Sequence, residues 1–312
     1  MSIRLGYQIP NYTYPGPVEN TFDTVAAQAR EAESAGFDTV LVMDHFYQLP
    51  GIGAPEAAML EAYTTLGAIA QHTSTVQLST LVTGNTYRNP ALLAKTVTTL
   101  DVVSHGRAIL GIGAGWFERE HHDYGFEFGT FGQRFERLEE ALTIIAPMLK
   151  GEPGTLDGKW YTARGAMNNP RVRPTIPIML GGSGEQKTFR LAARFADHMN
   201  IICDIDDLAR KVGVLRERCE EIGRDPATLA TSYLVMGMVG ETDAEVKELA
   251  GSIPEDRRNR SFLGTADQVA EQLHERVLGA GIDGLTINLI RNGHRPGVVA
   301  AVGAALKPLV KS

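Results

Sequence analysis

The chain has 312 residues, of which 43% are hydrophobic and 21% charged, and its formal net charge is −7. This composition is typical of a soluble globular protein, and no apolar run approaches the roughly 20 residues that a membrane-spanning helix needs. The acidic balance argues against nucleic acid as a partner, and two isolated cysteines give no disulfide framework or zinc site. We therefore expect a cytoplasmic protein that acts on a small molecule, away from nucleic acids and membranes.

The first half of the chain alternates short apolar strands with helices. The helix that follows the first strand should end at Gly36, because glycine adopts the positive φ of a helix C-cap without strain. The pattern predicts strands at Ile3–Ile9, Thr39–Met43, Val76–Val82 and Ala108–Gly111, with helices over Thr21–Ala35, near Ala57–His72, after Pro90 and over Phe131–Lys150.

The second half continues this alternation, with two interruptions. Further strands are predicted at Ile176–Leu180, His198–Cys203, Ser232–Val239 and Gly284–Leu289, with a helix over Ala266–Gly279. The segment 151–174 carries a hairpin signal at Asp157-Gly158, and the segment 252–263 includes a charged stretch at 254–260. We expect both to be insertions outside the sheet, the first lying over the active-site end.

Eight strand–helix units in a chain of this length predict a (β/α)8 TIM barrel, with a doubly wound open sheet as the alternative. Since the composition shows no break, residues 1–312 are expected to form a single domain. The carboxyl ends of barrel strands meet at one mouth, where such enzymes carry their active sites. Four clusters should meet there: Asp44-His45, Thr83–Thr86, Gly111–Trp116 and Gly181–Gly184.

Two of these clusters are rich in glycine. Gly111–Gly115 lacks the sixth-position glycine of the dinucleotide fingerprint, where Trp116 stands, so a Rossmann site is not expected. Its glycines suit either the close approach of a flat ring or tight strand-to-helix packing. The second cluster, Gly181–Gly184, precedes a helix expected near Glu185 and suits either an anion site built from backbone N–H groups or a flexible turn.

Histidines offer two further hypotheses. His45 follows Asp44 at the end of a strand, and imidazole exchanges protons near neutral pH, so His45 is a candidate proton donor or acceptor; a structural role is the alternative. His121 and His122 are adjacent, and adjacent helical residues point about 100° apart. We therefore expect no metal there, and instead a solvated helix end near the mouth.

Five segments, in this order and spacing, resemble the luciferase-like monooxygenase superfamily, and specifically its oxidoreductases that depend on the deazaflavin coenzyme F420. They are Phe37–Phe46, Val76–Pro90, Ser104–Gly125, Asn169–Gly182 and Gly264–Ile290, and together they span nearly the full chain. The resemblance implies a (β/α)8 barrel, usually homodimeric, that holds an isoalloxazine-type ring at its mouth.

The resemblance also implies site residues. A bulge with a non-proline cis peptide supports the ring in such enzymes, and the match places that bond at Leu81-Val82. Asp44 and His45 match an Asp-His pair that contacts the deazaflavin and assists proton transfer. If His45 does not carry the proton, Tyr87, Glu120 and solvent are the next candidates. Cofactor contacts are expected at Asp44, His45, Leu81, Val82, Thr83, Ala114, Gly115, Gly181, Gly182 and Ser183.

The chain departs from one branch of this family. Relatives that oxidise a sugar phosphate carry a catalytic glutamate where this chain has Trp116, and their phosphate-binding lysines have no clear match. Sugar-phosphate oxidation is therefore not expected. Trp116, Phe117 and Tyr161 are expected to line a pocket for a more apolar or planar substrate.

We expect hydride transfer between coenzyme F420 and a small organic substrate. One alternative is an FMN-dependent monooxygenase that uses reduced flavin and O2. A second alternative is a deazaflavin-binding protein without catalytic activity.

Overall fold

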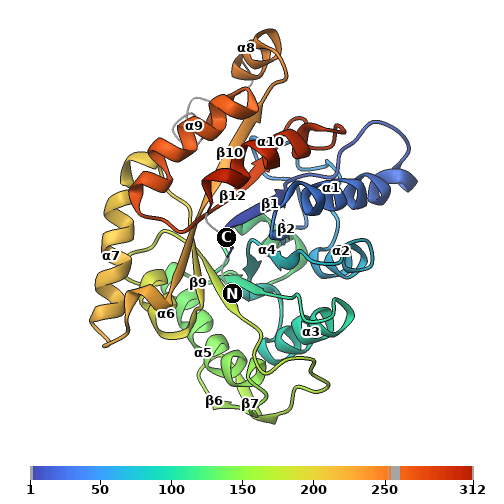
Figure 1. Ribbon diagram of the computed structural model, residues 1–312. Helices are drawn as coiled ribbons and strands as arrows, with labels where there is room; N and C mark the ends of the chain where they lie inside the picture. Colours follow the sequence, from blue (N-terminus) through green and yellow to red (C-terminus); the bar gives the residue numbers. More distant parts are fainter. Residues whose placement is uncertain (1–2, 252, 254–260, 311–312) are drawn as a thin grey trace.

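The computed structural model describes residues 3–251, 253 and 261–310, and its central feature is a parallel sheet enclosed by helices (Figure 1). Its strands are β1 (Leu5–Ile9), β2 (Thr39–Val42), β3 (Gln77–Thr80), β4 (Thr83–Gly84), β5 (Leu110–Gly113), β8 (Ile178–Gly182), β9 (His198–Ile201), β10 (Ala230–Val239), β11 (Ser261–Gly264) and β12 (Gly284–Leu289). The helices are α1 (Thr21–Ala35), α2 (Ala62–Ala70), α3 (Pro90–Val103), α4 (Glu118–Tyr124), α5 (Phe131–Leu149), α6 (Thr188–Phe195), α7 (Leu208–Glu220), α8 (Asp243–Gly251), α9 (Ala266–Arg276) and α10 (Val298–Leu306).

The sheet closes on itself. Its strand order is β3-β2-β1-β12-β10-β9-β8-β5-β4, so the two ends of the order are β3 and β4. These are two pieces of one strand: β3 pairs with β2, and β4, three residues further along, pairs with β5. A further parallel bridge joins Leu78 to Ala108. With β3 and β4 counted as one position, the ring has eight positions, which confirms the (β/α)8 barrel and excludes the open sheet.

Local signals account for the helix ends. Gly36 caps α1 with φ 93°, Asn89 caps α3 through its side chain, and Thr130 forms a capping box with Gln133 at the start of α5. The helix expected near Ala57 begins only at Ala62, because the side chain of Glu61 accepts a hydrogen bond from Thr64 N–H and so fixes the N-cap there.

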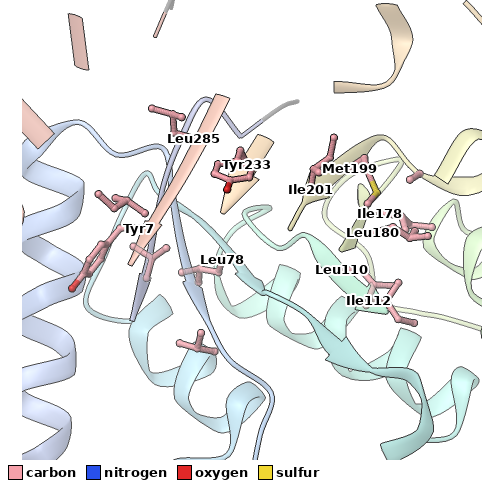
Figure 2. Packing of buried hydrophobic residues seen from close by; sticks show 14 of the residues in the cluster. Tyr7, Leu78, Leu110, Ile112, Ile178, Leu180, Met199, Ile201, Tyr233 and Leu285 are labelled. Atoms are coloured by element: carbon pink, nitrogen blue, oxygen red, sulfur yellow. The ribbon is translucent and has the colours of Figure 1, made fainter. Parts of the chain in front are cut away.

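Alternate strand residues face two different cores. Leu5, Tyr7 and Ile9 of β1 pack with the helices in the large outer cluster, part of which is shown in Figure 2. Leu41, between the outward-facing Val40 and Val42, belongs instead to a smaller cluster inside the barrel. The members of that inner cluster are Ile3, Leu41, Leu81, Ile109 and Met179. Strands buried on both faces explain their continuous apolar runs.

The two interruptions of the alternation have different outcomes. The first contains the expected hairpin, β6 (Gly154–Asp157) with β7 (Thr162–Ala166). It lies beside α5 (Figure 1), where the Glu140 carboxylate accepts hydrogen bonds from three consecutive backbone N–H groups of residues 159–161. Its expected position over the mouth stays a prediction.

The second segment, 252–263, was expected to lie outside the sheet, but its last residues belong to a strand. Residues 254–260 lie outside the described residues, but β11 pairs in parallel with the end of β10, from Met236 to Val239. Its Phe262 is fully buried, and this burial explains why so short a segment joins the sheet. Among the described residues, no helix combines the length and apolar character needed to cross a membrane.

Candidate active site

A cavity of about 440 Å³ lies at the carboxyl ends of the barrel strands. It brings together residues from four separate loops that the sequence analysis had singled out. Those in its wall are Asp44, His45, Leu81, Val82, Thr83, Ala114, Gly115, Trp116, Gly181, Gly182 and Ser183. The wall also includes Tyr87, Phe131, Arg134, Phe135, Leu138 and Thr188, which the sequence analysis had not assigned to a binding pocket.

Two of the predicted pocket residues are not in this wall. Phe117 stacks on Trp116, with ring centroids 5.3 Å apart, and its ring lies at the edge of His45. Tyr161 is on the hairpin, and its backbone N–H donates to Glu140 of α5. The role of these two rings in binding a substrate stays a prediction, because neither is in the wall of this cavity.

The wall between β3 and β4 is formed by Leu81 and Val82. The peptide bond between them is cis, which confirms the prediction made from the resemblance. A Cβ on Gly113 or Gly181 would lie 2.9 or 2.7 Å from the methyl groups of Val82. A Cβ on Gly111 would lie 1.9 Å from the Thr80 carbonyl oxygen. Tight packing around this interrupted strand therefore requires glycine at these positions; contact with a ring stays a prediction.

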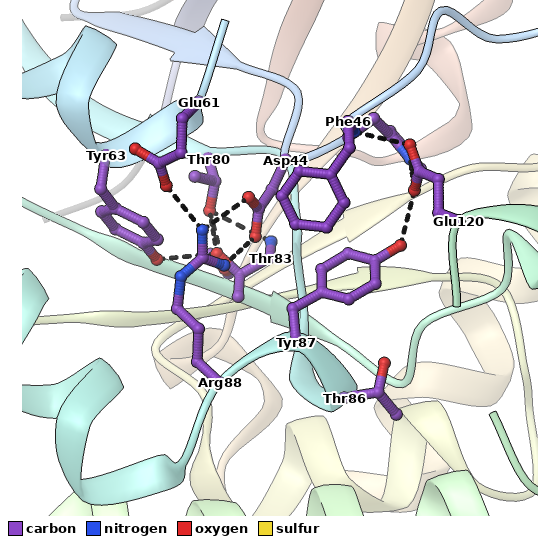
Figure 3. A network of polar contacts seen from close by, with 12 residues as sticks. Asp44, Phe46, Glu61, Tyr63, Thr80, Thr83, Thr86, Tyr87, Arg88 and Glu120 are labelled. Atoms are coloured by element: carbon purple, nitrogen blue, oxygen red, sulfur yellow. Dashed lines mark hydrogen bonds and ion pairs between the residues drawn. The ribbon is translucent and has the colours of Figure 1, made fainter. Parts of the chain in front are cut away.

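Thr83 lies in a directed chain of hydroxyl groups beside this wall (Figure 3). The Thr80 hydroxyl donates to the Gly111 carbonyl, so it can only accept from the Thr83 hydroxyl, 2.9 Å away. The Tyr63 hydroxyl in turn donates to Thr83 over 2.7 Å. Because its own hydrogen is used within the wall, Thr83 can offer a bound molecule only an acceptor.

His45 is held by a buried carboxylate from α4. Its Nδ1 lies 2.9 Å from Oε2 of Glu120, whose side chain is fully buried while that of His45 is 12% exposed. A carboxylate only accepts hydrogen bonds, so Nδ1 carries the hydrogen. The other ring nitrogen, Nε2, is then the one available to exchange a proton in the cavity.

Glu120 also fixes the loop that carries His45. Its Oε1 accepts from the backbone N–H groups of Phe46 and Tyr47 at 2.6 and 2.9 Å, and its Oε2 accepts from the Tyr87 hydroxyl at 2.7 Å (Figure 3). Burial alone would raise the pKa of the Glu120 carboxyl, but these hydrogen bonds and the one from His45 outweigh it, so the pKa lies below its usual value. Glu120 is therefore an ionised partner for His45.

Asp44 is locked on the other side of the same turn. Arg88 donates to both of its carboxylate oxygens, at 2.6 and 3.0 Å, and also reaches Glu61 at 2.7 Å (Figure 3). Burial would lower the pKa of the Arg88 guanidinium, but the two carboxylates raise it above its usual value. A charged bidentate pair of this kind fixes both position and orientation, so Asp44 and His45 enter the cavity from a rigid turn.

His121 corrects the prediction of a solvated helix end. It is fully buried: Nδ1 donates to the Phe117 carbonyl at 2.8 Å, and Nε2 accepts from the Thr86 hydroxyl at 2.6 Å. Burial lowers the pKa of the His121 ring, which therefore stays neutral. The neighbouring His122 is exposed, which agrees with the prediction of a solvated position.

The turn Gly181–Gly184 leads to α6 later than expected, because the helix begins at Thr188 and not near Glu185. The turn is tied to α7 by Lys211, whose ammonium donates to the Ser183 carbonyl at 3.0 Å and pairs with Glu185 at 2.9 Å. Lys187, at the N-cap of α6, forms no side-chain capping bond.

The family model described as luciferase-like monooxygenase matches residues 3–263. The chain belongs to this family. It is 37% identical over 169 residues to an F420-dependent glucose-6-phosphate dehydrogenase of Microbacterium testaceum. The aligned residues cover 53% of this chain and 48% of that relative. It is 30% identical over 230 residues to an F420-dependent hydroxymycolic acid dehydrogenase of Mycobacterium tuberculosis, covering 72% and 61% of the two chains. The chain thus matches about half to three-fifths of the length of these relatives.

Solved structures of the luciferase-like fold resemble the whole chain. The F420-dependent tetrahydromethanopterin reductase from Methanopyrus kandleri superposes with a TM-score of 0.80 and 18% identity, over 100% of both chains. The EDTA monooxygenase of Chelativorans sp. BNC1 superposes with a TM-score of 0.82 and 17% sequence identity, over 99% of this chain and 94% of the other. These similarities show the luciferase-like barrel, and with the family model they confirm the resemblance drawn from the sequence.

The sequence analysis missed much of what supports this luciferase-like site. Arg88 and Arg134 carried no local signal, because isolated arginines are usually solvated. Glu120 was named only as a fallback proton carrier, because nothing in its run of charged neighbours distinguishes it from the exposed Glu118. One signal was available: in a helical projection of Glu118–Tyr124, Glu120 and His121 lie on the edge that is buried.

Proposed function

We propose that this protein is an oxidoreductase that transfers a hydride between coenzyme F420 and a small organic substrate, with His45 moving the proton. The names of the relatives at 30–37% identity support the choice of cofactor. The observation that carries the proposal is the cavity in which a histidine, held by a buried ionised carboxylate, shares a wall with Leu81 and Val82.

The residues present fit such a cofactor. The cavity volume is within the range of about 300–1,000 Å³ that small-molecule sites occupy. Leu81 and Val82 provide an apolar surface for a flat ring, and the glycines of two loops leave the backbone accessible beside it. One cationic side chain, Arg134, complements an acidic ligand.

When bound, the deazaflavin supplies the carbon that accepts or gives the hydride. The chain supplies orientation and the proton. Glu120 keeps Nδ1 of His45 protonated and the ring fixed, so that Nε2 can take the proton from a substrate hydroxyl as its carbon loses a hydride, or give a proton to the carbonyl oxygen in the reverse direction. The Asp44–Arg88 pair holds the turn that carries the ring. Positioning of this kind is the main contribution a protein makes to cofactor chemistry.

The wall indicates the character of the substrate. Trp116, Phe131 and Phe135 supply aromatic surface, and Trp116 and Phe131 are each 60% exposed. Exposed rings at a cavity mouth suit an apolar or planar substrate. Together with the position of Trp116, this argues against a sugar phosphate. We further propose, from the family resemblance, a cytoplasmic homodimer, which light scattering and cell fractionation test.

The decisive experiment is a titration of the purified protein with F420 and with FMN, followed by turnover assays. The proposal expects preferential F420 binding. It also expects reduction of F420 by a secondary alcohol, or oxidation of reduced F420 by an activated double bond. An oxygenated product formed from reduced FMN, O2 and a substrate would establish the monooxygenase alternative. Tight F420 binding without turnover over a broad substrate panel would establish a non-catalytic binding protein.

A further inference from the structure

The carboxylate of Glu120 is shared among four hydrogen-bond donors. Oε1 accepts from the backbone N–H groups of Phe46 and Tyr47. Oε2 accepts from Nδ1 of His45 and from the hydroxyl of Tyr87. A carboxylate has about four lone-pair sites, and this side chain is fully buried. The four donors therefore fill the hydrogen-bonding capacity of the group, and His45 shares one oxygen with Tyr87.

Tyr87 makes the shorter of the two contacts on Oε2. Its hydroxyl lies 2.7 Å from this oxygen, against 2.9 Å for Nδ1 of His45 (Figure 3). Burial raises the pKa of the Tyr87 hydroxyl well above its usual value, and the hydrogen bond to Glu120 raises it further. The hydroxyl therefore stays protonated and acts as a donor to the carboxylate.

The ring of Tyr87 is held firmly in this position. It packs against the rings of Phe46, His121 and Phe126, with centroids 4.9, 4.9 and 5.4 Å away. On its other edge, a Cβ on Gly84 would lie only 2.6 Å from Cε2 of the tyrosine. The packed ring thus fixes the direction in which the hydroxyl points.

The residues on either side of Tyr87 reinforce this placement. The hydroxyl of Thr86 lies 2.6 Å from Nε2 of His121 on α4. Arg88 donates to both carboxylate oxygens of Asp44, in the turn after β2. Because both neighbours are tied to the elements that carry the histidine and its carboxylate, the backbone of Tyr87 moves with them.

Two donors on one oxygen compete for its negative charge. A hydrogen bond that stabilises a carboxylate makes it a weaker partner for a second donor or for a cation. The Tyr87 hydroxyl therefore reduces what the His45 ring gains from Glu120 when that ring takes up a second proton and becomes a cation.

The other charged or titratable groups around His45 lie apart from this oxygen. Asp44, which precedes it, is paired with Arg88. Arg134 of α5 lies in the wall of the same cavity. On α4, burial lowers the pKa of His121, so this ring is neutral. Removal of one tyrosine hydroxyl leaves the charges of all these groups unchanged.

We propose that Tyr87 is a positioning residue that limits the proton affinity of His45 by sharing Oε2 of Glu120. Its consequence for turnover rests on the proposed function, in which Nε2 of His45 exchanges the proton. The sharing itself is a property of the protein without cofactor or substrate, and it can be measured there.

The test is a pH titration of the histidine ring nitrogens by NMR, on isotope-labelled wild type and Tyr87→Phe. His45 is one of eight histidines, and the signals lost in His45→Ala identify it. Removal of the hydroxyl should raise the titration midpoint of His45 by roughly half to one pH unit, a 3- to 10-fold gain in proton affinity. In alcohol oxidation, the acid limb of the pH profile of kcat/KM should rise by the same amount.

Tyr233→Phe is the matched control. The Tyr233 hydroxyl is also buried, but it donates to the neutral carbonyl of Cys203 at 2.8 Å, and the residue is not in the cavity wall. This variant should lose stability in urea and leave the His45 midpoint unchanged. Fluorotyrosine in place of Tyr87 keeps the ring and makes the hydroxyl a stronger donor, so it should lower the midpoint.

An unchanged or lowered midpoint in folded Tyr87→Phe would overturn the inference. If that variant does not fold, the fluorotyrosine protein decides, and a midpoint that fails to fall overturns the inference. The expected shifts without turnover on any substrate would support the sharing of Glu120 and contradict the proposed function. Normal F420-dependent turnover with an unchanged midpoint would do the reverse.

Discussion

The barrel holds one histidine at its mouth and another in its interior, and their surroundings differ in kind. His45 lies at the edge of the cavity with Nδ1 on the ionised Glu120 carboxylate. His198, on β9, is buried inside the barrel with Nε2 2.7 Å from the Ser232 hydroxyl. Asn200 donates to the same hydroxyl. A carboxylate attracts the charge that a protonated ring carries, whereas a hydroxyl offers only a dipole.

The two histidines therefore differ in the charge of their partners. Burial lowers the pKa of His198 to about 3, so its ring is neutral at neutral pH. At the mouth, two buried carboxylates each have a partner: Asp44 pairs with Arg88, and Glu120 accepts a hydrogen bond from His45. The same residue type is therefore paired with an ionised carboxylate at the mouth and with neutral polar groups in the interior.

The largest effect is expected for His45→Ala. If Nε2 moves the proton, turnover should fall by a factor on the order of 10²–10⁴, while F420 affinity stays largely intact. Steady-state kinetics and a cofactor titration on the folded variant measure both. A histidine that only packs would give the opposite result, with lower stability and normal turnover per folded molecule.

Glu120→Gln should have a smaller effect on the same step. The amide keeps the shape but loses the ionised acceptor, so His45 is oriented less firmly, and turnover should fall by roughly 10- to 100-fold with little change in cofactor affinity. A double-mutant cycle separates positioning from folding. In the His45→Ala background, Glu120→Gln should reduce turnover no further, and an additive loss would show that Glu120 acts independently of His45.

His198→Gln tests the interior histidine, and its effect is on stability. The folded ring stays neutral down to about pH 3, whereas the unfolded ring takes up a proton below about pH 6.5, so acid favours the unfolded wild type. The wild type should lose about 1.4 kcal/mol per pH unit below 6.5 through this group. His198→Gln lacks this titrating group. The difference in free energy of unfolding between wild type and variant should therefore shrink by about 2 kcal/mol between pH 7.5 and pH 5. Urea denaturation at both values measures this, and parallel losses would contradict it.

Several elements were predictable because their determinants are local. The helix Thr21–Ala35 and the strand Gly284–Leu289 have the bounds expected from hydrophobic periodicity and from Gly36. The convergence of Asp44, Ala114 and Gly181 was predictable as well, because strands of a parallel barrel all end at one mouth. The family and the position of the Leu81-Val82 bond came from resemblance, not from periodicity.

Tertiary structure alone decided which groups meet. Glu120 reaches His45 across 75 positions of the chain, and Arg88 reaches Asp44 across 44. The strand β11 was missed because burial of Phe262, not a long apolar run, adds it to the sheet. Periodicity reports which face of an element is apolar. Pairing energies between buried charges depend on distances that only the packed barrel fixes.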